Sequence, residues 1–378
     1  MRIFFISIFV FVFNYIFSQV QTGAEHFEQY VDSLKGKKIG MVVNQTSVVG
    51  HSHLVDTLKH MGINIVKIFA PEHGFRGDAD AGEHIKHSVD PKTNFHIVSL
   101  YGENKKPTSA QLSDIDVVVF DIQDVGCRFY TYLSTLVYVM EACAENNKKL
   151  VILDRPNPNI MYTDGPTLDL KLKSFVGMLP IPVLYGMTLG EMAQMINGEK
   201  WLTNGIKCNV EIVKNSNYDR TTEYELPVKP SPNLPNKQAV RLYASLCIFE
   251  GTHVSVGRGT EFPFQTFGHP SFKKDTFSFC PKATHGAKHP MYKNVICHGM
   301  DLRNYKFEEG LTLRFLLIAH SRLSDGQFFD NISFFDKLAG NDQLRKMLVD
   351  QKSEKEIRKS WQKDINSFIS KRKKYLLY

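Results

Sequence analysis

Three short runs of this chain each place a carboxylate directly after a strand-like hydrophobic segment. The runs are residues 71–77 (PEHGFRG), 121–132 (DIQDVGCRFYTY) and 153–159 (LDRPNPN). The segments before them, residues 63–70, 116–120 and 149–153, are short and rich in β-branched residues, which is typical of a sheet buried on both faces. Ligands of open α/β sheets bind beyond the carboxyl ends of such strands. We therefore expect one crevice to hold four carboxylates: Glu72, Asp121, Asp124 and Asp154.

Carboxylates that share a crevice raise each other's proton affinity, which suits general acid/base catalysis on a sugar or polyol. A metal site is the alternative use of such a cluster. The sequence has no HExxH, paired CxxC or EF-hand spacing, and Arg76, Arg128 and Arg155 would lie close to any bound cation. The sequence therefore favours acid/base chemistry without a metal or another cofactor.

Glu72 is the first candidate for the acid/base group, because it directly follows a buried strand and because His73 and Phe75 could partly desolvate it. Asp121 and Asp124 compete for the second catalytic role, and Asp121 comes first as the residue directly after its strand. The alternatives are structural. Asp124 could cap the following helix, Asp154 could orient Arg155 or a sugar hydroxyl, and His73 could be an ordinary buried polar residue.

The elements that would position these residues alternate between strand and helix in the N-terminal half. Strands are predicted at residues 37–43, 63–70, 95–100, 117–120 and 150–153, and helices at 51–60 and 131–145. Such alternation indicates a parallel sheet, and thus an α/β fold. Thr188 and Glu191 form a capping box at the start of another helix, which Gly198 ends, so that Glu191 is interpreted as structural.

Four prolines between residues 227 and 235 (PVKPSPNLP) predict a stiff segment between two domains. At 378 residues and 43% hydrophobic content, the chain can bury two cores. Its net charge of +7 is concentrated at the end, where residues 351–378 contain nine Lys/Arg and three Asp/Glu, a balance of +6. We interpret that segment as a helix, residues 353–373, with a solvated basic face and a stripe of Ile357, Trp361, Ile365 and Phe368 that packs in the core.

Several longer motifs resemble, in order, those of the exo-β-N-acetylmuramidase family of peptidoglycan hexosaminidases, formerly a domain family of unknown function. They include EHGFRGDADAGE, DIQDVGCRFYTYLSTL, LDRPNPN, SPNLPN, FEGTHVSVGRGTEFPFQ and the final KYLLY. The resemblance implies a Rossmann-like N-terminal catalytic domain, residues 27–228, and a smaller α+β domain, residues 229–378, with the active site in the cleft between them. It also implies release of N-acetylmuramic acid (MurNAc) from the non-reducing ends of peptidoglycan fragments, in cell-wall turnover.

The same resemblance supplies candidate substrate-binding residues. They are Asn44, His73, Arg76, Gln123, Arg128, Tyr130, Asp154, Arg155, Asn157, Ser231, Asn233, Glu250, Ser255, Arg258 and Glu261. MurNAc carries a lactyl carboxylate, which a guanidinium can bind through two parallel hydrogen bonds. Arg258 is interpreted as that clamp, although Arg76, Arg128 and Arg155 compete for the role and each could instead pair with an acidic residue. Ser231 and Asn233 could equally cap turns.

Two other classes of function fit the sequence less well than a glycoside hydrolase. A non-catalytic cell-wall sugar-binding protein would use aromatic surfaces such as Tyr101, Phe129, Tyr130 and Tyr185, but it would not need an acidic cluster. A nucleotide-dependent Rossmann enzyme would need a GxGxxG turn after the first strand, where this chain has NQTSVVG. Nucleic acid is not expected as a partner, since no aromatic residues interleave the basic stretch.

The N-terminus resembles an export signal. Arg2 is followed by an apolar stretch from residue 3 to residue 17, which is short for a membrane span. We expect a signal peptide of residues 1–22, cleaved between Ser18 and Ala24, and a periplasmic or secreted protein without a stable membrane span. The six cysteines show neither zinc nor redox-pair spacing, and Cys127 is interpreted as structural.

Overall fold

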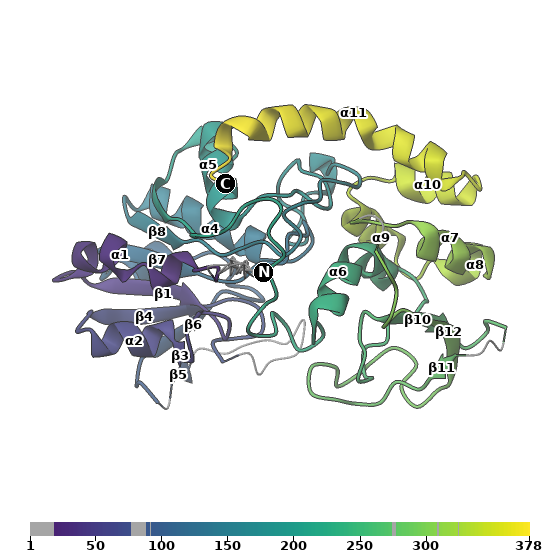
Figure 1. The fold of residues 1–378 in the computed structure, drawn as a ribbon, viewed down its shortest axis with the longest axis horizontal. Coiled ribbons are helices and arrows are strands. Elements are labelled where there is room, and N and C mark those ends of the chain that lie inside the picture. Colours follow the sequence, from purple (N-terminus) through teal and green to yellow (C-terminus); the bar gives the residue numbers. More distant parts are fainter. Residues whose placement is uncertain (1–18, 77–87, 91, 274–276, 308–309, 324) are drawn as a thin grey trace, which may run out of the picture.

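The chain folds around a seven-stranded sheet with helices on both faces and a second, smaller domain beside it (Figure 1). The computed structural model describes residues 19–76, 88–90, 92–273, 277–307, 310–323 and 325–378. In spatial order the strands are β5 (Ser88–Val89), β6 (His96–Ser99), β4 (Ile65–Ala70), β1 (Ile39–Val43), β7 (Val117–Asp121), β8 (Lys149–Leu153) and β9 (Asn209–Val213). All neighbours pair in parallel except the edge strand β5. The prediction of an α/β fold with a parallel sheet is confirmed, and its strand order is that of doubly wound folds.

Two hydrophobic layers cover the sheet. On one face α1 (Phe27–Leu34) and α2 (Leu54–His60) bury Tyr30 and Leu58 against the strands. On the other face α4 (Tyr132–Glu145) and α5 (Leu189–Gly198) bury Met140 and Met192. The predicted capping box of Thr188 and Glu191 is confirmed at the start of α5, which ends at Gly198 as expected.

The second domain combines helices with a small antiparallel sheet, as expected for α+β. The sheet has the order β10 (Thr266–His269), β12 (Cys297–Asp301) and β11 (Ser278–Phe279). The helices around it are α6 (Lys237–Leu246), α7 (Arg314–Ser321), α8 (Asp325–Phe328), α9 (Ile332–Ala339) and α10 (Gln343–Val349). The predicted boundary, residues 227–235, lies in the irregular segment that connects β9 to α6.

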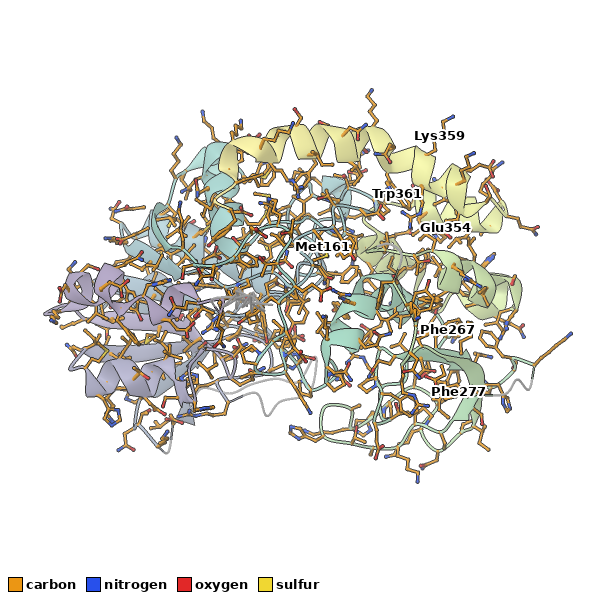
Figure 2. The ribbon with its side chains drawn as sticks, viewed as in Figure 1. Met161, Phe267, Phe277, Glu354, Lys359 and Trp361 are labelled. Carbon is orange, nitrogen blue, oxygen red and sulfur yellow. The ribbon has the colours of Figure 1, made fainter. Side chains whose placement is uncertain are left out.

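The last helix, α11 (Glu354–Arg372), crosses the top of the molecule and reaches back to α5 (Figure 1). A capping box of Ser353 and Glu356 starts it. Ile357, Trp361, Ile365 and Phe368 are buried, which confirms the predicted core stripe; Figure 2 shows Trp361 pointing inward and Lys359 outward. Beyond the helix, Tyr378 inserts its ring beside Tyr218 of the first domain.

Some predicted boundaries were wrong. The helix predicted at residues 51–60 begins at Leu54, because Ser52–His53 (β3) pairs with Val48–Val49 (β2) in a hairpin. Asp121 is the last residue of β7 and not the first residue after it. The short elements that remain are α3 (Ser109–Leu112), η1 (Gly23–Glu25), η2 (Leu170–Leu172), η3 (Thr203–Gly205), η4 (Cys247–Gly251) and η5 (Lys373–Tyr375).

Most of the predicted signal peptide, residues 1–18, lies outside the described residues. Within the described part of the chain, no helix combines the length and the apolar character that crossing a membrane requires.

Candidate active site

The crevice where a doubly wound sheet usually binds ligands is filled by this protein's own side chains. It lies between β1 and β7, where the strand order reverses. Asn44 Oδ1, just after β1, accepts hydrogen bonds from the backbone and hydroxyl of Thr46, at 2.9 and 2.6 Å. Ser47 donates to the carbonyl of Asp121, and Thr46 Oγ1 accepts from the backbone N–H of Gln123. The switch point is therefore a packed part of the fold.

Asp121 is fully buried in an ion pair. Arg155 donates to both of its oxygens, with Nε–Oδ1 at 2.5 Å and Nη2–Oδ2 at 2.9 Å, and also to the carbonyl of Val48. Both side chains are almost entirely buried. Arg155 therefore pairs with an acidic residue and is not free to bind a substrate carboxylate. The residue that orients Arg155 is Asp121, whereas the sequence had suggested Asp154.

Asp124 occupies a second buried position. Its Oδ2 accepts hydrogen bonds from the hydroxyl of Tyr185 and from the N–H of Gly126, while Oδ1 is buried and has no partner among the described residues. Burial raises its pKa to about 6, against the opposing effect of these bonds. Asp124 therefore shapes the loop after β7 and does not cap α4, whose N-cap residue is Thr131.

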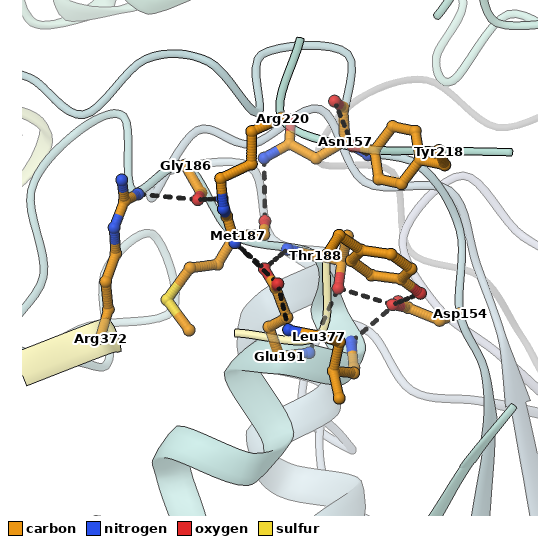
Figure 3. Close-up of polar contacts among 12 residues, drawn as sticks. Asp154, Asn157, Gly186, Met187, Thr188, Glu191, Tyr218, Arg220, Arg372 and Leu377 are labelled. Atoms are coloured by element: carbon orange, nitrogen blue, oxygen red, sulfur yellow. Dashed lines mark hydrogen bonds and ion pairs between the residues drawn. The ribbon is translucent and has the colours of Figure 1, made fainter. Parts of the chain in front are cut away.

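Asp154 lies in a third, separate network, which joins the sheet to the end of the chain (Figure 3). It accepts hydrogen bonds from Thr188 Oγ1 at 2.6 Å, the N–H of Gly190 at 2.9 Å and the hydroxyl of Tyr378 at 2.8 Å. Burial raises its pKa to about 6. The expectation that four carboxylates share one crevice is thus corrected, since three of the four are each enclosed by different partners.

Glu72 is the carboxylate of the four that lines a cavity. It follows β4 after Pro71 and is partly exposed. Its Oε2 accepts a hydrogen bond of 2.6 Å from Thr131 Oγ1, and the Tyr101 hydroxyl also hydrogen-bonds to it. Burial, together with the negative charge of Glu72, raises the pKa of Tyr101, so that Tyr101 stays a neutral donor. Two hydroxyl groups thus hold this carboxylate at the edge of the cavity.

Part of the lining of this cavity comes from the second domain. Glu250, in η4, and Arg258 both line it, and Arg258 Nε donates to Glu250 Oε1 at 2.5 Å. The guanidinium lies 4.9 Å from the ring centre of Phe264. Each side chain of the pair is about one-quarter exposed. Among the described residues, Glu72 and Glu250 are the carboxylates that this cavity exposes, one from each domain.

Aromatic and apolar side chains line the rest of the cavity. Tyr243 makes edge-to-face contacts with the rings of Phe129, Tyr130 and Phe264. Ser231 and Leu234 come from the segment between the domains. The hydroxyl of Tyr130 donates to the carbonyl of Pro230 at 2.7 Å. Such a wall of aromatic rings with a few charged groups suits a sugar that carries apolar substituents.

Two of the competing arginines are engaged elsewhere. Arg128 is buried and donates to the carbonyls of Pro166, Ile181 and Leu338. Arg76 forms an ion pair with Asp90, with Nη2–Oδ2 at 2.9 Å, and lies over the ring of Phe75. Of the four candidate clamps, Arg258 is the arginine that lines the cavity.

The remaining predicted residues are distributed as follows. His73 and Ser231 line the cavity, and Asn233 Nδ2 donates to the carbonyl of Gly286. Gln123, Asn157 and Ser255 make buried hydrogen bonds within loops, and Glu261 is exposed. Asn44 is buried with no partner for its Nδ2 among the described residues. Thr131 and Tyr243 also line the cavity and were not predicted, because no sequence pattern marks a hydroxyl or a ring as facing a cavity.

The described residues contain no cluster of three or more histidine, cysteine or acidic side chains arranged to hold a metal ion. The cysteines are free, and all except the half-buried Cys280 are buried. Burial raises the pKa of the Cys127 thiol well above its usual value, which agrees with a structural role.

Comparisons with known proteins cover the whole of this architecture. The family model described as "Exo-beta-N-acetylmuramidase NamZ, N-terminal" matches residues 39–238, and its C-terminal counterpart matches residues 241–378. The peptidoglycan beta-N-acetylmuramidase NamZ of Bacillus subtilis (strain 168) is 37% identical over 386 residues, which cover 95% of this chain and 92% of that protein.

Two crystal structures of DUF1343 family proteins from Bacteroides fragilis NCTC 9343 share the fold. One is 47% identical with a TM-score of 0.89 and covers 96% of this chain and 99% of its own. The other is 29% identical with a TM-score of 0.82, and covers 95% of this chain and 99% of its own.

Proposed function

The chain belongs to the exo-β-N-acetylmuramidase NamZ family, and from this premise we propose that it is a glycoside hydrolase that releases MurNAc from the non-reducing ends of peptidoglycan fragments. One observation supports this function above all: a carboxylate from each domain, Glu72 and Glu250, lines the same aromatic cavity. Hydrolysis of a glycosidic bond usually requires two such groups.

Glu72 acts as the general acid. The carboxylate must first take up a proton from solvent, and this proton then passes to the glycosidic oxygen while the bond between that oxygen and the anomeric carbon breaks. Thr131 and Tyr101 fix the orientation of the carboxyl group through their hydroxyls. His73 is buried and lines the same cavity. A carboxyl group with fixed orientation in a partly dry site is well placed to transfer a proton.

Glu250 takes the second role that the sequence suggested for Asp121 or Asp124. Asp121 and Asp124 are enclosed by their own partners, whereas Glu250 reaches the cavity. The ion pair with Arg258 orients the carboxylate of Glu250, which can stabilise positive charge at the anomeric carbon or activate water. Arg258 uses its Nε for Glu250, so that its terminal N–H groups can bind the lactyl carboxylate that distinguishes MurNAc.

The cellular location follows from the N-terminal signal and remains a proposal. We infer an exported, periplasmic or secreted enzyme of cell-wall turnover. Gln21 pairs with Ser216 through two backbone hydrogen bonds, of 2.9 and 3.2 Å. A signal peptide of residues 1–22 would remove this pairing, so we now place the expected cleavage before Gln21, still within the range from Ser18 to Ala24. N-terminal sequencing of the exported protein checks this, and a mature chain that begins after Gln21 would contradict it.

The test of the function compares the mature protein with Glu72→Gln and Glu250→Gln variants. A glycan that ends in MurNAc and chromogenic MurNAc and GlcNAc glycosides serve as substrates. We expect the wild type to release MurNAc and leave the GlcNAc glycoside intact, and each variant to lose at least about 100-fold in kcat, as is usual for a lost acid/base group. Glu28→Gln, on the far face of the sheet, is the matched control and should stay active.

The outcomes separate the alternatives. Binding of the glycan without release of MurNAc by the wild type would favour a sugar-binding protein. Normal activity of the Glu250→Gln variant would return the second role to Asp121 or Asp124. Circular dichroism spectra of all variants exclude misfolding as the cause of a loss.

A further inference from the structure

The outward face of α11 carries a row of lysines directly opposite its buried face. Lys355, Lys359 and Lys363 are exposed and follow one another at intervals of four residues, and Lys352 and Lys374 extend the row at both ends. Residues four apart lie on the same side of a helix, so the ammonium groups form a line. Figure 2 shows Lys359 directed away from the protein and Trp361 toward it.

Most of the protein's net charge lies in the segment that contains this row. Residues 351–378 contribute +6 of the formal +7. Lys352 and Lys374 approach Glu356 and Glu199, at 4.0 and 2.9 Å. For the three central lysines, no carboxylate among the described residues lies within ion-pair distance. Like charges four residues apart destabilise a helix, so the fold itself gains nothing from this row.

The residues between the lysines restrict the chemistry of a partner. Gln362, Asn366, Ser367 and Ser370 are exposed on the same side, and no large hydrophobic residue of α11 is exposed. A helix that binds a membrane interface needs an exposed apolar face, which α11 uses for its own core. Single-stranded nucleic acid binds to aromatic platforms, which this face lacks. Ammonium, amide and hydroxyl groups together fit a hydrated polymer that carries carboxylates and hydroxyls.

We propose that this lysine face of α11 binds polymeric peptidoglycan through the carboxylates of its lactyl groups and peptides. The choice of polymer rests on the function proposed above, and the binding surface is separate from the cavity. At 19 residues, α11 is about 28 Å long, so several sugars of one strand can contact it at once. Such a surface would hold the enzyme on its insoluble substrate between successive cleavages.

The test uses a triple variant, Lys355→Gln, Lys359→Gln and Lys363→Gln, of the mature protein. The matched control removes the same charge elsewhere, through Lys207→Gln, Lys214→Gln and Lys293→Gln, three exposed lysines outside α11. Binding to purified sacculi is measured by co-sedimentation over a range of salt concentrations. Hydrolysis of the soluble chromogenic MurNAc glycoside is measured in parallel.

We expect the α11 variant to bind sacculi about tenfold more weakly at low salt, with a shallower dependence on salt, because released counterions drive such binding. The control variant should bind like the wild type, and all three proteins should hydrolyse the small glycoside equally. Equal binding by both triple variants would overturn the proposal, as would tighter binding to phosphatidylglycerol vesicles than to sacculi. An inactive wild type that still binds sacculi through α11 would refute the proposed catalysis and leave the docking surface intact.

Discussion

At the residue scale, the ion pair between Asp121 and Arg155 determines what Asp121 can do. Replacement by Asn would leave the Arg155 guanidinium buried without a compensating charge. We expect Asp121→Asn to lower the free energy of unfolding by about 3–5 kcal/mol, as for other buried pairs that lose one partner. Urea unfolding measures this loss, and kcat of the protein that remains folded at low temperature should stay within tenfold of wild type.

A double variant, Asp121→Asn with Arg155→Met, is the control and should recover part of the lost stability because no unpaired charge remains. Full stability of the single variant combined with a 100-fold lower kcat would instead identify Asp121 as catalytic, as its position beside a strand end suggested.

The raised pKa of Asp124 predicts a pH dependence of stability. The folded protein holds this proton more tightly than the unfolded chain, so the stabilising contribution is largest below pH 4 and is lost as the pH rises through about 6. A pKa that rises from 3.8 to about 6 on folding corresponds to about 3 kcal/mol over this range. We expect Asp124→Asn, which mimics the neutral acid, to gain up to this amount relative to wild type between pH 4 and pH 7.

Chemical unfolding of both proteins at several pH values tests this prediction. The difference between them isolates Asp124 from the other carboxylates. A difference that does not change with pH would show that the carboxylate is already ionised at pH 4.

These residues also show why the site could be predicted only in part. Asp121, Asp124 and Asp154 look equivalent in the sequence, since each lies at or just beyond the end of a strand. Their partners, Arg155, Tyr185 and Tyr378, are 34, 61 and 224 residues away. Tertiary packing therefore decides which carboxylate stays accessible. Glu72 was the first candidate because it lies just beyond its strand, whereas the second carboxylate that lines the cavity comes from another domain.

At the scale of elements, the N-terminal 3-10 helix η1 is fitted tightly against the ends of β8 and β9. A Cβ atom at Gly23 would lie 2.2 Å from the carbonyl oxygen of Val213 and 2.6 Å from the backbone nitrogen of Asp154. We expect Gly23→Ala to destabilise the protein by about 1–3 kcal/mol, the usual cost of overpacking. Thermal unfolding measures it. Gly326→Ala, which meets no atom within 4 Å, is the control, and equal melting temperatures for both variants would contradict the prediction.

Five strands, β1, β4, β6, β7 and β8, were predicted to within about two residues, because β-branched runs fit buried parallel strands. The edge strands β5 and β9 and the strands of the two small sheets were not predicted. The order of the strands could not be predicted either, since local sequence does not say which strands pair. The start of α2 was predicted wrongly for a related reason. Ser52 and His53 pair with Val49 and Val48 in the β2–β3 hairpin, and the spacing of apolar residues in a helix does not show such pairing.

At the scale of the whole molecule, one hydrophobic core continues through both domains. It contains Val118 and Met140 beside the large sheet as well as Phe267 and Phe315 of the second domain. We therefore expect a single cooperative thermal transition, with equal calorimetric and van't Hoff enthalpies. Differential scanning calorimetry tests this. Two resolved transitions, or a stable isolated fragment of residues 27–228, would show that the domains fold independently.

The return of α11 onto the first domain has a mechanical consequence. The irregular segment that contains Pro230 connects the two domains on one side, and α11, anchored by Tyr378 on Asp154, connects them again on the other. These two connections together restrict the motion of one domain relative to the other. Glu72 and Glu250, one from each domain, therefore keep their positions relative to each other. The transition state then meets groups that need no rearrangement, which is the condition under which electrostatic stabilisation is most effective.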